Sequence, residues 1–275
     1  MSPTGDADLL VRARSVLLDA LEGLVEHRAS LVVIGAQAIY LHTGAADLPL
    51  AEATKDSDLV LDPRDLGGSP LLEAAMTAAG FHRDLINGQP GSWLSEDGVP
   101  VDLMVPEALA GTGGRRGARI PPHSKHATRR AAGLEAAVVD HSPMDIAALD
   151  PADPRTITVN VAGPAALLVA KLHKIGERKE QPGRLVDKDA HDIYRLLSAT
   201  TTAAVATGLA GLLADDLAAP ATRTGLDYLR ELFSSPTALG PTMVGRAELL
   251  VGNPAVAGAS AAALASDLII AVDRW

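Results

Sequence analysis

The sequence predicts an α+β protein in which a mixed-sheet domain is followed by an α-helical domain. Two observations lead to this expectation. Short apolar runs of strand length alternate with helical patterns up to about residue 163, and the pattern beyond that point is helical. Pro164 suits the first turn of a helix. We therefore expect an α/β domain over residues 1–163 and a helical domain over residues 164–275.

The N-terminal half begins with a helical pattern, because Leu10, Leu17 and Leu21 recur at helical spacing over residues 8–28. Gly35 separates a buried strand from the helix that follows it. Strands are expected at residues 31–34, 57–61, 81–86, 92–95, 99–105, 134–139 and 156–161. Helices are expected at residues 36–42 and 70–79. Residues 111–133 are rich in Gly, Pro and Arg, which predicts a loop.

The C-terminal half is expected to be helical throughout. Helices are predicted over residues 164–178 and 187–198, and three or four more follow, separated by proline and glycine. No secretory signal is expected, since no basic segment followed by an apolar run opens the chain. No membrane span is expected either, because the apolar run at residues 261–272 is short and contains Asp267. We expect a cytoplasmic protein.

The composition narrows the chemistry. The chain has 275 residues and 47% hydrophobic residues, so it can bury a core. It has no cysteine, which excludes disulfides, thiolate metal sites and cysteine nucleophiles. The net charge of −10 argues against nucleic-acid binding by the surface as a whole.

The first chemical signal is the pair Gly35-Ala36, where a strand ends and a helix begins. A helix N-terminus has free N–H groups and a partial positive charge, which suit a phosphate. Junctions of this kind are also common in proteins that bind no phosphate.

The second signal is the segment Thr54-Lys55-Asp56-Ser57-Asp58. Residues two apart in a strand point to the same face, so Asp56 and Asp58 are expected side by side. Two adjacent carboxylates repel unless a cation or a proton lies between them, and oxygen ligands suit Mg²⁺. The alternative is a solvated polar strand end.

A third aspartate, Asp102, interrupts an apolar strand at the parity opposite to Val101 and Leu103. Beside Asp56 and Asp58 it would complete a site for two metal ions, which can activate an attacking hydroxyl and stabilise a leaving pyrophosphate. The alternative is an exposed aspartate on a half-solvated strand.

Charged residues also gather on the two helices after residue 163. Lys171 and Arg178 share one helix face, and Asp189 and Asp192 share a face of the next helix. The cations would neutralise phosphate charge and the aspartates would orient them. The alternative is an ordinary salt bridge between helices.

The expected loop at residues 111–133 is strongly basic and contains no acidic residue. Such a patch would attract a tRNA backbone or an acidic partner surface, although it offers no aromatic stacking platform. The alternative is a solvated flexible loop. Its basic residues are Arg115, Arg116, Arg119, Lys125, Arg129 and Arg130.

Taken in order, these segments resemble the AbiEii-like nucleotidyltransferases, toxins of abortive-infection and toxin–antitoxin systems. The matching stretches are residues 33–39, 54–59, 101–103, 171–178 and 188–194. The resemblance implies a nucleotidyltransferase (polymerase-β-like) fold. It also implies Mg²⁺ held by Asp56 and Asp58, and an NTP whose triphosphate lies near Gly35. Lys171, Asp189 and Asp192 would be essential. Some relatives, the MenT-like toxins, add nucleotides to the 3′ end of tRNA.

The sequence departs from the family pattern at two places. Glu52 stands where an arginine is frequent, and Ala36 replaces a common Gly or Ser. Lys55, beside Thr54, is a candidate replacement for that arginine in binding the nucleotide.

We expect transfer of NMP from an NTP to an acceptor, the tRNA 3′ end, by a toxin with a cognate antitoxin protein. Asp102 would help to activate the nucleophile, and Lys171 and Arg178 would bind phosphate. The alternatives are a small-molecule (aminoglycoside-type) nucleotidyltransferase and a non-catalytic relative that binds a nucleotide or a partner.

Overall fold

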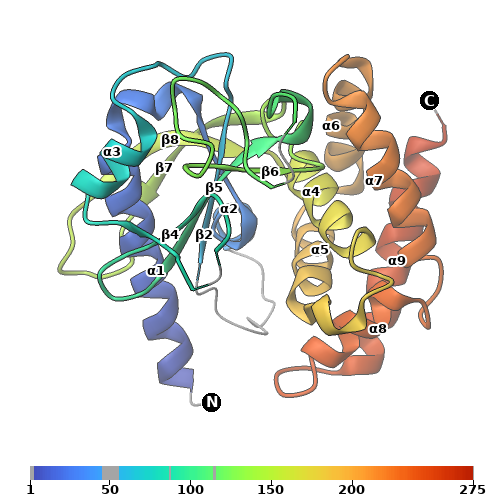
Figure 1. The fold of residues 1–275 in the computed structure, drawn as a ribbon. Helices are drawn as coiled ribbons and strands as arrows, with labels where there is room; N and C mark the ends of the chain where they lie inside the picture. The colour runs from blue at the N-terminus through green and yellow to red at the C-terminus, as the bar shows by residue number, and fades with distance from the viewer. Residues whose placement is uncertain (1–2, 45–55, 87, 114–115, 275) are drawn as a thin grey trace. The chain divides into compact units, whose positions relative to one another are not determined.

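The computed structural model describes residues 3–44, 56–86, 88–113 and 116–274. The chain is α+β, with a mixed open sheet and many helices, as expected (Figure 1). It divides into two compact units. The sheet unit comprises Met1–Ala38, Ala53–Leu134 and His141–Ala162. The helical unit comprises Ile39–Glu52, Glu135–Asp140 and Gly163–Trp275.

The sheet unit is built on an eight-stranded sheet with the order β3-β4-β5-β2-β1-β8-β7, and β6 also pairs with β5. The strands are β1 (Leu31–Ile34), β2 (Ser57–Leu61), β3 (His82–Arg83), β4 (Ser92–Leu94), β5 (Pro100–Pro106), β6 (Arg129–Ala131), β7 (His141–Ala147) and β8 (Thr156–Ala162). β1 is antiparallel to β2 and parallel to β8, while β5 is parallel to β2 and β6. The central strands β1, β2 and β5 carry buried apolar residues on both faces, as expected for strands in the middle of a sheet.

The sheet unit also contains helices. They are α1 (Pro3–Gly23), the short η1 (Val25–Ser30), α3 (Leu72–Ala78) and η2 (Glu107–Leu109). α1 lies against β2 and β5, and its Leu17 and Leu21 are fully buried. The Ser57 hydroxyl, on the same face of β2 as Leu59, donates to the Ala13 carbonyl of α1 at 3.2 Å. This face of β2 is therefore buried against α1.

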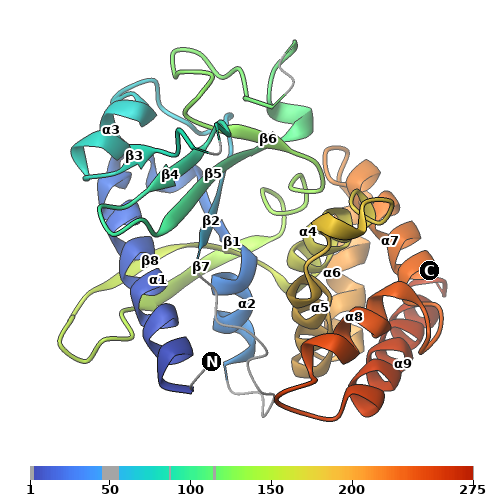
Figure 2. The same cartoon turned by 60° about the horizontal axis from the view of Figure 1, so that its bottom comes forward.

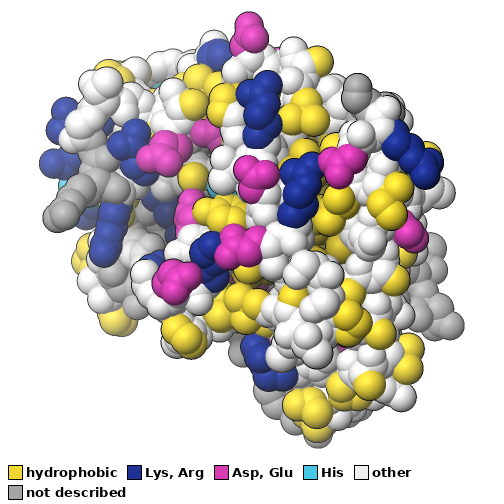
Figure 3. Space-filling model, turned by 90° about the vertical axis from the view of Figure 1, so that its right-hand side faces the viewer, with side chains coloured by type: hydrophobic (Ala, Val, Ile, Leu, Met, Phe, Trp, Pro, Cys, Tyr) yellow, Lys and Arg dark blue, Asp and Glu magenta, His cyan; other side chains and the backbone are white. Residues whose placement is uncertain are grey.

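The helical unit is a set of packed helices (Figure 2). They are α4 (Pro164–Gly176), η3 (Pro182–Arg184), α5 (Asp187–Ala199), α6 (Thr202–Ala214), α7 (Ala219–Leu232), α8 (Leu239–Ala247) and α9 (Pro254–Val272). The end of α2 (Gly35–Thr43) belongs to this unit from Ile39 onward. α4 packs against α5, α6 and α7. Acidic and basic side chains are interspersed over the face of the molecule seen in Figure 3.

One helix of the described residues, α9, is long and apolar enough to cross a membrane by length and composition alone. Its most apolar stretch has a mean hydropathy of 1.9, and 39% of that stretch is buried. α9 packs against α6 and α8, and Ala261, Ala265 and Leu268 are inaccessible. α9 thus packs one of its faces against other helices of the unit.

One predicted strand is absent, two observed strands were not predicted, and one is shorter than expected. Residues 134–139 form buried turns, and alanine and valine there fill the core without pairing. β7 was not foreseen because most of its side chains are exposed, so it lacks apolar alternation. β6 lies inside the expected loop. β3 is limited to His82–Arg83, because the Asp84 carboxylate accepts the Ile86 N–H at 3.0 Å and turns the chain.

Candidate functional site

The site begins at the junction of β1 and α2. Gly35 has φ of +68°, a conformation that favours glycine. A Cβ atom at Gly35 would overlap the Oδ2 atom of Asp58, which pairs with Ile34 across β1 and β2. The glycine is therefore required twice, once for the backbone conformation and once for the approach of the carboxylate. Ala36, the second residue of α2, is buried.

Asp58 and Asp102 are direct partners in the parallel pairing of β2 and β5. Partners in a ladder point to the same face, and neighbouring strands lie about 4.8 Å apart. Both aspartates are partly exposed, whereas the neighbours Ser57, Leu59 and Leu103 are inaccessible. The sheet therefore places two carboxylates next to each other on one accessible face.

Ser92 extends this polar row. It pairs with Asp102 across the antiparallel strands β4 and β5 and is partly exposed. The row across the sheet is thus Ile34, Asp58, Asp102 and Ser92. The sequence pointed to the two aspartates but not to Ser92, because only the strand pairing relates it to them.

Asp56 lies one residue before β2 and is exposed. The strand that was expected to align it with Asp58 begins only at Ser57. Within the part of the chain that the structure describes, no group of three or more His, Cys, Asp or Glu residues is arranged to hold a metal ion. Mg²⁺ is usually held by one or two carboxylates together with substrate phosphates. The pair of Asp58 and Asp102 fits that requirement.

Arg129 completes the site from β6. Its Nη2 lies 2.7 Å from Oδ2 of Asp102 and 3.1 Å from the Met104 sulfur. The Arg129 side chain is 28% exposed and that of Asp102 is 17% exposed, so the ion pair is shielded from bulk water. Arg129 was predicted to face RNA in a basic loop. The structure instead pairs it with a predicted catalytic residue.

A glycine allows β6 to reach Asp102. Two strands pair with the same edge of β5: β4 pairs with its first residues, Pro100–Asp102, and β6 pairs with its last residues, Met104–Pro106. Gly91, with φ of +76°, lies between the two, and Leu103 N–H donates to its carbonyl at 2.8 Å. A Cβ at Gly91 would overlap the backbone of Leu103 and Arg129. The change of partner along β5 thus depends on a residue without a side chain.

Three predicted site residues cannot be placed. Thr54 and Lys55, expected to bind the nucleotide, lie outside the described residues, as does Glu52. Arg115 of the basic segment lies outside them as well.

The remaining basic residues of the segment fall into two groups. Arg116, Arg119 and Lys125 are exposed. Arg130 is partly buried, and it donates to the Gly111 carbonyl at 3.0 Å and lies 4.0 Å from Glu107. The exposed group is therefore the part of the segment that a polyanion can reach.

In the helical unit, the structure brings Lys171, Asp189 and Asp192 together. Lys171 Nζ lies 2.8 Å from Asp189 Oδ1 and 2.6 Å from Asp192 Oδ2, and all three side chains are at least 92% buried. Lys174 Nζ is 2.9 Å from Asp189, whereas Arg178 Nη1 is 4.0 Å away. The predicted association of these residues across α4 and α5 is present.

The charges in this cluster stabilise one another. Burial alone would lower the pKa of Lys171, but the two aspartates outweigh it and raise that pKa. Burial would raise the pKa of Asp189, yet Lys171 and Lys174 hold it well below its ordinary value. Lys171 is thus fully engaged with protein carboxylates, as in a structural ion pair. The binding of phosphate by Lys171 and Arg178 stays a prediction.

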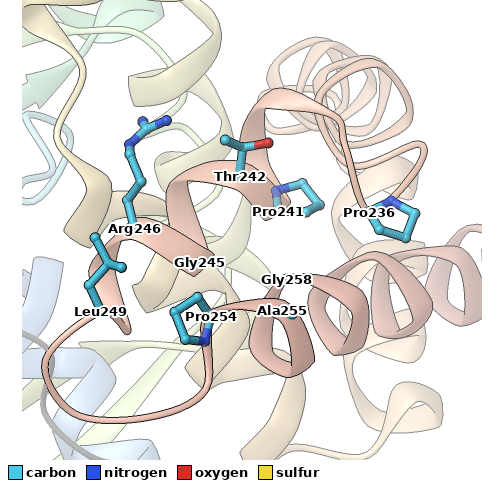
Figure 4. A pocket seen from close by; sticks show the side chains of 9 residues that line it. All are labelled: Pro236, Pro241, Thr242, Gly245, Arg246, Leu249, Pro254, Ala255 and Gly258. Carbon is cyan, nitrogen blue, oxygen red and sulfur yellow. The ribbon is translucent and has the colours of Figure 1, made fainter.

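A hollow of about 370 Å³ lies between α8 and α9 of the helical unit (Figure 4). Its lining is mostly proline, glycine and alanine, and its one charged residue, Arg246, donates to Asp187 at 2.9 Å. Arg246 is thus the one cation among the lining residues described, and Asp187 already engages it, whereas a triphosphate requires several cations. This hollow is therefore a poor candidate for the nucleotide site.

No family model matches the chain, and no curated protein or solved structure shows significant similarity to it. The candidate site is therefore defined by its own geometry.

Proposed function

We propose that the chain is a Mg²⁺-dependent nucleotidyltransferase. The observation that carries the proposal is the pairing of Asp58 with Asp102 in the sheet unit, with Gly35 against the Asp58 carboxylate. The helix that begins at Gly35 offers free N–H groups to a triphosphate. The two carboxylates beside it suit a Mg²⁺ ion that is also bound by the phosphates. The resemblance of the sequence segments to AbiEii-like nucleotidyltransferases supports the same function.

Asp58 and Asp102, with Asp56 before the strand, would hold the Mg²⁺. The ion would neutralise phosphate charge and polarise the phosphoryl oxygens. Ser92, in the same row, would donate a hydrogen bond to a substrate oxygen. Gly35 leaves room for the Asp58 carboxylate beside the start of α2, and the free N–H groups of that first turn would bind the phosphate.

In the proposed reaction, the oxygen of an acceptor hydroxyl attacks the α-phosphorus of the NTP. A new P–O bond forms, the bond between the α-phosphorus and the bridging oxygen breaks, and pyrophosphate leaves with the bond electrons. The hydroxyl proton passes to the Asp102 carboxylate and then to water. Arg129 keeps that carboxylate in place by its 2.7 Å ion pair.

We infer that the acceptor is the 3′ end of tRNA and that the protein acts as the toxin of a toxin–antitoxin pair. The exposed Arg116, Arg119 and Lys125 lie in the sheet unit, in the same segment as Arg129. Exposed cations in an otherwise acidic chain attract a phosphate backbone. The choice of tRNA and of a protein antitoxin rests on the sequence resemblance.

The test is incubation with each α-labelled NTP, Mg²⁺ and total tRNA. Transfer of label to RNA is expected for the natural chain and should be lost in Asp58→Asn and Asp102→Asn. Asp97→Asn is the matched control, because Asp97 belongs to the same unit and its side chain is 78% exposed. Equal labelling by all three variants would refute the proposed site.

The same experiment separates the two alternatives. Transfer to an aminoglycoside but not to RNA would favour the small-molecule enzyme. NTP binding with no transfer to RNA or to small acceptors would favour a non-catalytic relative.

A further inference from the structure

The Arg129 guanidinium has a contact set that differs from the exposed cations of the same segment. It reaches back along β5 from its partner Met104 to Asp102, two residues earlier. Its Nε atom is buried and has no hydrogen-bond partner among the described residues. A buried N–H without a partner is unfavourable, so the position is maintained by the other contacts of the side chain.

The backbone of Arg129 is fixed on both sides. It pairs with Met104 of β5 on one side and forms an antiparallel bridge with Gly117 on the other. The neighbouring Thr128 carbonyl accepts the Ala118 N–H at 3.2 Å, and Arg130 N–H donates to the Arg116 carbonyl at 2.8 Å. Gly91 leaves the space that this backbone requires. The guanidinium therefore extends from a rigid base.

Nη2 of Arg129 lies 2.7 Å from Oδ2 of Asp102, within the range of a charge-assisted hydrogen bond. A contact this short restricts the rotation of the Asp102 carboxylate. Residues that orient a metal-binding carboxylate from outside the ligand set commonly change metal affinity by 10–100-fold when removed. Arg129 has the geometry of such a residue.

We propose that Arg129 is a positioning residue that orients the Asp102 carboxylate for a divalent cation shared with Asp58. This inference rests on the proposed function, since it requires a cation at that pair. It assigns Arg129 to the metal site and removes it from the residues that contact an RNA backbone. The competing view is that Arg129 occupies the place of the cation and is displaced by it.

The experiment measures Mn²⁺ binding to the full chain without nucleotide, by the electron paramagnetic resonance signal of free Mn²⁺. We expect Arg129→Gln to raise the Kd for Mn²⁺ about 10-fold or more. Arg129→Lys should have an intermediate effect, because an ammonium restores the charge but not the planar fork of donors. Arg83→Gln is the matched control, since it removes an exposed cation of the same unit, and its Kd should equal that of the natural chain.

Two further measurements keep the outcomes separate. Far-UV circular dichroism and the melting temperature show whether each variant is folded. If Arg129→Gln does not fold, the Mn²⁺ affinity of Arg129→Lys tests the positioning role instead. Asp58→Asn tests whether Mn²⁺ binds at the pair at all. Binding that is lost in Asp58→Asn but unchanged or tighter in the Arg129 variants would overturn the positioning role alone. A natural chain with no saturable Mn²⁺ site, or one indifferent to Asp58→Asn, would overturn the metal site and this inference together.

Discussion

Lys171→Met would remove the cation that joins two buried carboxylates of the helical unit. Lys171 Nζ lies 2.8 Å from Asp189 and 2.6 Å from Asp192, and the carboxylates are only 5% and 3% exposed. Removing one member of a buried ion pair costs about 3–5 kcal/mol, because the other is left buried without compensation. Lys174 and Lys188 remain at 2.9 and 3.3 Å from the two aspartates. We therefore expect the low end, about 3 kcal/mol.

The assay is urea unfolding followed by far-UV circular dichroism, which reports mainly on helices. Trp93 is buried in the sheet unit, so its fluorescence follows that unit in a Trp275→Phe background. Lys171→Met should lower the unfolding midpoint seen by circular dichroism more than the one seen by fluorescence. Lys179→Met is the control, because Lys179 pairs with Glu231 at the surface and its loss should change little.

The charge argument also predicts a rescue. Lys171→Met combined with Asp189→Asn and Asp192→Asn removes both buried carboxylates that lost their main cation. Lys174 and Lys188 lose a carboxylate partner in this variant, so we expect a partial recovery, of at least half of the lost stability. A Lys171→Met chain as stable as the natural one would refute the reasoning. So would a triple variant no more stable than the single one, since the loss would then come from packing around the lysine stem.

Three further predictions concern the two units separately. Gly35→Ala should abolish Mn²⁺ binding, because its Cβ would overlap the Asp58 carboxylate. Gly98→Ala is the control, since Gly98 has a similar positive φ but open space at its Cβ; it should lower the free energy of unfolding in urea by about 1–2 kcal/mol and leave Mn²⁺ binding intact. Equal Mn²⁺ affinities of the two variants would contradict the crowding against Asp58. Burial lowers the pKa of His123 below 6.5, so the contribution of this histidine to stability is complete above that pH and is lost as the pH falls. His123→Gln should therefore lose less unfolding free energy than the natural chain between pH 7.5 and 5.5. Identical pH profiles of the unfolding free energy would refute this. Asp140→Ala should destabilise the helical unit by about 1 kcal/mol in urea, because Oδ2 accepts an N–H of the first turn of α4 at 3.2 Å; Asp140→Asn should recover part of it.

The strands and helices that the sequence predicted well are those whose signal is local. β1, β2 and β5 are apolar runs bounded by glycine or proline, and their burial in the centre of the sheet requires that composition. α4 and α5 have a helical repeat and a proline at the first turn of α4. For these elements the local pattern and the tertiary environment favour the same structure.

The parts that escaped prediction depend on pairing between distant segments. β7 is an edge strand containing Pro143, and its partner β8 determines its extended form. The ion pair of Arg129 with Asp102 joins residues 27 positions apart in sequence, through a strand whose edge changes partner at Gly91. No spacing within a single segment encodes such a contact. The same applies to Ser92, which joins the row only through antiparallel register.

The arrangement explains how two carboxylates can share one row of the sheet before any cation arrives. Like charges at this separation repel, so each needs its own source of positive charge. Asp58 lies against Gly35 at the first turn of α2, where the helix dipole is positive, and Asp102 has the guanidinium of Arg129. The two compensating groups come from different elements: the start of α2 lies against Asp58, and Arg129 contacts Asp102. Loss of either one should therefore weaken the cation site by disturbing a single carboxylate, and the loss of both should weaken it more than either alone.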